Sequence, residues 1–161
     1  MLGRIFPRQF DNIYRGHWLG LWLFVPVILV KGLQGANSIV TTRLVMINAD
    51  GIPLDSFDAV AAQAAIGMFT LLGMYLLILP VQGAVALIRY RSMIPLLYLM
   101  LIIVQAAGRL LVLWHPVIQT GQLPLGFFVN LGILAITLLG FVLSLSGKSD
   151  SPERPVAGGT R

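Results

Sequence analysis

Charged residues are scarce in this sequence. Aspartate, glutamate, lysine and arginine make up 11% of the 161 residues, whereas 57% are hydrophobic. Soluble domains carry about 25% charged residues, so the composition is that of a membrane protein. Long stretches with almost no charge occupy most of the chain and leave no room for a separate soluble domain. We therefore expect an integral membrane protein.

Cysteine is absent and histidine is nearly so, which narrows the chemistry open to the protein. Without cysteine there is no disulfide, no thiolate metal site and no cysteine nucleophile. The two histidines, His17 and His115, fall at opposite faces of the predicted membrane region, so they cannot bind one haem or metal ion within a single chain. No serine has a histidine and a carboxylate that the topology brings beside it, as a hydrolytic triad requires. We expect no catalytic residue, no metal, no cofactor and no enzymatic activity.

The apolar runs predict four transmembrane helices, at about 18–40, 57–88, 93–114 and 125–145. They form an all-α, polytopic four-transmembrane-helix bundle in one domain, residues 1–146. A disordered cytoplasmic tail, rich in glycine, proline and serine, is expected at 147–161. The first run is short enough for a signal peptide. However, a cut after Ala36 would place Gln34 at the −3 position, where small residues are required, so we expect an uncleaved helix.

Two short sequence matches raise the alternative that the bundle consists of two tandem helical hairpins. Residues 51–54, before the second span, resemble 121–125 before the fourth, and 70–73 recur as 137–140. Two hairpins related by an axis along the membrane normal are a known arrangement. The spacing between the two matches differs by about one helical turn, so the alternative stays open.

The basic residues indicate how the protein is oriented. The net charge is +5, and the positive side chains gather at the ends of the apolar runs rather than in a patch suited to nucleic acid. They lie in residues 1–17, at 89–91 and in the tail, whereas the other two loops hold only Arg43. Basic loops stay on the cytoplasmic side. We therefore expect a multi-pass protein of a bacterial-type inner membrane with both termini cytoplasmic.

Each predicted span carries one narrow stripe of polar residues. Lys31 interrupts the first span about half-way across, where a charge is costly and needs a receiving group. Gln34 and Ser38 follow it at i+3 and i+7 on the same helix face. Such stripes are typical of a bundle with a partly polar interior. The cluster predicted in the outer half of the membrane consists of Lys31, Gln34, Ser38, Gln63, Gln105, Arg109 and Asn130.

The loop after the first span is acidic and lies on the same outer side as this cluster. Its aspartates are Asp50, Asp55 and Asp58. One interpretation is that a loop aspartate pairs with Lys31, while Arg109 extends to the outer surface. The other is an outward-facing cationic pocket for a lipid headgroup, a quinone or a small anion. The aspartates match no EF-hand spacing, and Asp55 or Ser56 is expected to cap the second helix with Asp58 in its first turn, so a cation site is not expected.

These observations favour a structural role over a catalytic one. The short loops indicate a non-enzymatic accessory or assembly subunit of an inner-membrane complex, in contact with the lipid bilayer. Gly16 and Gly20, like Ala61 and Ala65, are four residues apart and permit close contact with other membrane subunits or a second copy. The alternative function is a small ligand-binding or transport protein that uses the outer cationic pocket. No nucleic-acid partner is expected.

Overall fold

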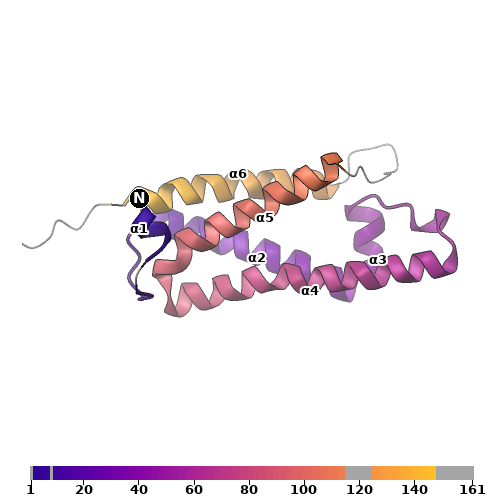
Figure 1. The fold of residues 1–161 in the computed structure, drawn as a ribbon, viewed down its shortest axis with the longest axis horizontal. Coiled ribbons are helices and arrows are strands. Elements are labelled where there is room, and N and C mark those ends of the chain that lie inside the picture. Colours follow the sequence, from indigo (N-terminus) through magenta and orange to yellow (C-terminus); the bar gives the residue numbers. More distant parts are fainter. Residues whose placement is uncertain (1, 8, 115–124, 148–161) are drawn as a thin grey trace, which may run out of the picture.

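The computed structural model describes residues 2–7, 9–114 and 125–147 (Figure 1). Every regular element in these ranges is helical. Four helices are long and apolar enough to cross a membrane. They are α2 (Trp18–Val40), α4 (Ala59–Arg89), α5 (Ile94–Trp114) and α6 (Leu125–Leu145). The all-α, four-helix prediction is confirmed, and the predicted span limits agree with the observed ones within two residues.

Short helical pieces extend the connections. The helical conformation breaks at Thr41, and the chain between α2 and α4 then becomes helical again in α3 (Thr42–Leu44) and a wide turn at Val45–Ala49. Gly51 follows with φ 67°, a conformation that only glycine adopts freely. A single turn, α1 (Leu2–Ile5), precedes the first span. The loop at 115–124, and all of the predicted tail at 147–161 except Gly147, lie outside the described residues.

The bundle has two ends, which are distinguished by the helix connections and chain ends that lie there. The N-terminal segment, the α4–α5 connection and the end of α6 lie together, at what we call the terminal end (Figure 1). The α2–α4 connection lies at the opposite end, which we call the loop end. The two basic segments that the structure describes, the N-terminal segment and the α4–α5 connection, therefore lie at the terminal end.

Helix α2 is the centre of the bundle, because it packs against α4 on one side and α6 on the other. The buried core lies toward the terminal end. There Phe24 meets Tyr98 of α5 edge to face, with ring centroids 4.9 Å apart. The Tyr98 hydroxyl donates to the carbonyl oxygen of Gly20 at 2.7 Å, so its polar end is satisfied inside the core. This end of the bundle is closely packed.

Glycines allow α2 and α4 to approach closely nearer the loop end. A Cβ on Gly35 would lie 3.2 Å from the Gly73 carbonyl oxygen, and a Cβ on Gly73 would lie 3.1 Å from the Gly35 carbonyl oxygen. The two helices therefore cross backbone to backbone, as small residues permit in membranes. Gly73 and its predicted counterpart Gly140 both face a hairpin partner, α2 for Gly73 and Tyr98 of α5 for Gly140. The tandem-hairpin alternative stays a prediction, since residues 121–124 are outside the described ranges.

The helices separate toward the loop end. Helix α5 packs mainly on α6, and it diverges from α4 beyond their connection (Figure 1). Its last five residues, from Leu110 to Trp114, are all between 52% and 81% exposed. Five consecutive residues point in every direction around a helix, so the described part of the chain covers no face of this end of α5.

Candidate functional site

The predicted cation in α2 is received by two amide groups. The Lys31 ammonium donates to the Oδ1 atom of Asn130, on α6, at 2.7 Å. It also donates to the Oε1 atom of Gln34, one turn along its own helix, at 3.1 Å. The side chain is half-buried. Because amide oxygens are neutral, these bonds satisfy the donors of Lys31 without neutralising its charge.

Helix α5 adds a second cation to the same region. The Arg109 guanidinium carbon lies 5.3 Å from the centroid of the Phe127 ring on α6, in cation–π geometry. Phe127 and Asn130 are about one turn apart on α6, so the structure directs two cations from different helices to the same part of α6. No carboxylate in the described residues is hydrogen-bonded to either cation.

Gln105 lies one turn from Arg109 and is incompletely satisfied. Its Nε2 atom is 3.4 Å from the Thr137 hydroxyl, a long contact for a hydrogen bond. Its Oε1 atom is buried and has no hydrogen-bond partner among the described residues. A buried polar atom without a partner is costly, so this oxygen marks a place where a donor would be stabilising.

Two of the predicted cluster residues lie elsewhere. Ser38 is buried against Gly73 of α4, and its hydroxyl donates to the Gln34 carbonyl oxygen at 2.9 Å. Its short side chain reaches only the adjacent helix, whereas the long Lys31 side chain extends to α6. Gln63 is exposed on α4. Lys31, Gln34 and Asn130 form one hydrogen-bonded group. Arg109 lies over Phe127, about one turn from Asn130 on α6, and Gln105 contacts Thr137, about two turns from Asn130.

Two of the three loop aspartates have partners other than Lys31 and Arg109 in the described part of the chain. Asp55 pairs with Arg43 at 3.1 Å on the exposed surface. Asp58, rather than Asp55 or Ser56, caps α4 by accepting from the Ala61 amide at 2.7 Å. Asp55 and Asp58 thus each bind a group close to them in the sequence. A contact of this kind loses less conformational entropy than one for which the loop must be ordered against the inside of the bundle.

Asp50 has a different environment. It belongs to the α2–α4 connection, and its half-buried side chain lies beside the first turn of α6, where a Cβ on Gly126 would be 3.3 Å from the Asp50 Oδ1 atom. Burial raises the pKa of this carboxyl above its ordinary value. Within the described residues, no group of three or more histidine, cysteine, aspartate or glutamate side chains is placed to hold a metal ion.

One histidine has a structural role. His17 caps α2, and its Nδ1 atom accepts from the Leu19 amide at 3.3 Å. His115 is outside the described ranges. Sequence reasoning missed the polar contacts that fix the N-terminal segment, such as the pairing of Asp11 with Ser92, because the two residues are 81 positions apart and neither belongs to a recognisable motif.

The fold and the apolar helices define the class: an all-α, polytopic membrane protein of four helices. Comparison with protein-family models, curated proteins and solved structures finds nothing that matches this chain. The function is therefore argued from the arrangement of its own residues.

Proposed function

We propose that the protein is a non-enzymatic subunit of an inner-membrane complex, and that other membrane helices pack on its loop end. The observation that carries this proposal is a set of helix glycines with open space beside them. A Cβ at any of these positions would meet nothing within 4 Å. They are Gly67 of α4, Gly108 of α5 and Gly132 of α6.

These positions differ from the glycines that the fold itself uses. Gly20, Gly35, Gly73, Gly83 and Gly140 each have a neighbour that a Cβ would crowd. Glycine inside a helix costs about 1 kcal/mol relative to alanine, and in membranes it allows another helix to approach closely. The open glycines have no such use within the described residues, and packing of a partner helix would supply one.

Two further features of the loop end support a partner. Gln63 is exposed one turn before Gly67, and a glutamine on a lipid-facing surface gains from a hydrogen bond to another helix. The described residues leave the end of α5, from Leu110 to Trp114, uncovered on every side. A helix that docks at the loop end would find an open glycine to pack on, a glutamine side chain to bond to and a large apolar surface to cover.

The experiment is native mass spectrometry of the full-length protein extracted gently from its own membrane. We expect a second protein chain at fixed stoichiometry, and Gly67→Leu, Gly108→Leu or Gly132→Leu should reduce its occupancy about tenfold, because leucine holds the helices apart. Ala84→Leu is the matched control, since Ala84 is also exposed on α4 but lies toward the terminal end. A bare monomer, or a partner retained in all three glycine variants, would contradict the proposal.

A second candidate function is supported by the cation pair. Lys31 and Arg109 reach α6 about one turn apart, at Asn130 and Phe127, and no carboxylate in the described residues is hydrogen-bonded to either. A small anion, a lipid headgroup or a quinone could bind these groups. In the same mass spectra, this alternative predicts a small-molecule adduct that Lys31→Met removes while the protein partner is unaffected.

A further inference from the structure

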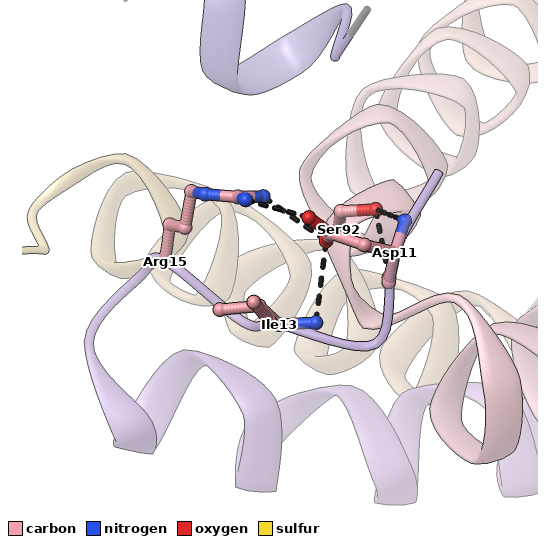
Figure 2. A network of polar contacts seen from close by, with 4 residues as sticks. All are labelled: Asp11, Ile13, Arg15 and Ser92. Carbon is pink, nitrogen blue, oxygen red and sulfur yellow. Dashed lines mark hydrogen bonds and ion pairs between the residues drawn. The ribbon is translucent and has the colours of Figure 1, made fainter. Parts of the chain in front are cut away.

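The N-terminal segment is fixed against the terminal end of the bundle. Arg4 donates to the carbonyl oxygens of Leu145 and Gly147, at 2.6 and 2.7 Å, and so binds the end of α6. The Asp11 amide donates to the Ser92 hydroxyl at 3.0 Å, and that hydroxyl donates to the Asp11 carbonyl oxygen at 2.9 Å (Figure 2). The described residues of this segment, 2–7 and 9–17, therefore form part of the folded surface.

This arrangement creates a hollow bordered by arginines from separate segments. Arg4 and Arg15 come from the N-terminal segment, and Arg91 comes from the α4–α5 connection. Ser92 and Tyr14 also line it. A neighbouring depression shares Arg15 and two other residues with it, so the two form one continuous concave surface. We call this surface the arginine hollow.

The arginine hollow carries an excess of positive charge in the described residues. Asp11 accepts from Arg15 at 3.0 and 2.6 Å (Figure 2). Arg4 and Arg91 instead donate to main-chain carbonyls. Among the described residues, Arg91 donates from its Nε atom to the Leu87 carbonyl oxygen at 3.0 Å, and no acceptor is hydrogen-bonded to its two terminal nitrogens. The part of the hollow that Arg4 and Arg91 line has a volume of about 20 Å³, too small to enclose a phosphate group, whereas the neighbouring depression has about 350 Å³. Guanidinium groups bind phosphate through paired hydrogen bonds, so a phosphate group fits at the open mouth of the hollow, beside the exposed Arg91.

Exposed apolar side chains beside the hollow indicate where that phosphate comes from. Phe6, Phe10 and Ile13 are 55%, 55% and 59% exposed, and Trp18 and Trp22 are 61% and 65% exposed. Aromatic residues at the start of a membrane span sit at headgroup level, with their rings toward the acyl chains. The arginines of the same segment are then at the level of the lipid phosphates.

We propose that the arginine hollow binds the phosphate group of an anionic membrane lipid, with Arg91 as the principal donor and Arg4 contributing positive charge nearby. The hollow is separate from the loop end, so this site does not depend on the proposed protein partner. With the predicted orientation it faces the cytoplasmic leaflet, where anionic lipids attract basic segments close to a membrane span.

The test is lipid retention by the full-length protein, measured by native mass spectrometry after incubation with phosphatidylglycerol or with phosphatidylcholine. We expect the wild type to retain phosphatidylglycerol preferentially. Arg91→Gln should weaken that retention about tenfold, the effect of losing one charge-assisted hydrogen bond. Arg91→Lys should recover part of it. Arg89→Gln is the matched control, because Arg89 is an exposed arginine at the end of α4, two residues before Arg91, but does not line the hollow.

The outcomes separate the possible sources of phosphate. Equal retention of the two lipids, or equal loss in Arg91→Gln and Arg89→Gln, would overturn the proposal. Displacement of phosphatidylglycerol by excess inorganic phosphate would also overturn it, because the ligand would then be a soluble phosphate. Thermal unfolding of each variant in the same detergent ensures that lost binding is not lost folding.

Discussion

Lys31 shows how a single charge is accommodated within a largely apolar helix. Its hydrogen bonds go to the amides of Asn130 and Gln34. These partners orient the ammonium without cancelling its charge, so the cation keeps its attraction for an anion. A residue bound in this way is both a structural link between α2 and α6 and a potential binding group.

The first prediction concerns this link. Asn130→Leu should destabilise the protein by about 1–2 kcal/mol, because it leaves the half-buried Lys31 with one acceptor. Adding Lys31→Met should restore most of the loss, since both polar groups are then replaced by apolar ones. Thermal unfolding in detergent measures the coupling. Lys31→Met combined with Asp55→Asn is the control. If the effects of Asn130→Leu and Lys31→Met on stability are additive, the hydrogen bond between the two residues does not stabilise the fold.

The second prediction concerns Asp11, whose pKa is held below the ordinary 3.8, chiefly by the hydrogen bond from Arg15. A carboxyl with a lowered folded-state pKa stabilises the fold above its ordinary pKa, and this contribution is lost as the pH falls through the folded value. We expect the protection factor of the Ile13 amide, which donates to Asp11 Oδ1 at 3.2 Å, to fall as the pH drops below 3.8 through the folded-state pKa of Asp11. Hydrogen exchange, corrected for the intrinsic pH dependence of amide exchange, measures this, and in Asp11→Asn the protection factor should not change over that range.

At the scale of the helices, glycine positions divide into those that the fold uses and those that it leaves open. Gly73 lies at the crossing with α2, where a Cβ would be 2.9 Å from Ser38 Cβ and 3.1 Å from the Gly35 carbonyl oxygen. Gly67, less than two turns away on the same helix, has nothing within 4 Å. The same residue type therefore has opposite consequences at two nearby positions.

The third prediction follows from this difference. Gly73→Ala should destabilise the isolated protein by about 1–3 kcal/mol through overpacking. Gly67→Ala should be neutral or stabilise it by up to about 1 kcal/mol, because alanine is the better helix former and has room. Circular dichroism during heating compares the two in one detergent. Equal destabilisation would mean that Gly67 is also packed within the chain.

The helices could be predicted from the sequence because their signals are local. The apolar runs predicted both limits of α2, at 18–40, and of α6, at 125–145, to the residue. Asp58, which was expected in the first turn of the second span, is the residue directly before α4. Residues 42–49 were expected to form a loop but are helical. The Thr42 hydroxyl contacts that of Thr70 on α4 at 3.0 Å, and a tertiary contact of this kind leaves no local pattern in the sequence.

The polar cluster was predictable in its face and depth but not in its pairing. The stripe pattern selected both Lys31 and Asn130, yet it could not say that α6 rather than the acidic loop lies within reach of Lys31. Being on the same side of a membrane is a weaker condition than being within hydrogen-bond distance. The contacts of the N-terminal segment depend in the same way on which helix ends are neighbours.

At the scale of the whole molecule, the contacts of the N-terminal segment restrict how the chain can cross the membrane. The N-terminal segment is bonded to the end of α6, so both must lie on one side of the membrane. The four candidate spans satisfy this condition, because an even number of crossings returns the chain to its starting side. The basic residues of the terminal end favour the cytoplasm for that side.

The last prediction tests this topology and uses the absence of cysteine, which makes the natural chain a background without reactive thiols. We expect a membrane-impermeant maleimide added to intact cells with a permeabilised outer membrane to label Ser56→Cys, since Ser56 is exposed at the loop end. Gly3→Cys and Ser146→Cys, exposed at the terminal end, should react only after the inner membrane is opened. The reverse labelling pattern would show that the protein has the opposite orientation in the membrane. Labelling of Gly3→Cys and Ser146→Cys from opposite sides would exclude an even number of spans. Because Arg4 bridges these two sites, that last result would also contradict the fixed N-terminal segment and, with it, the arginine hollow.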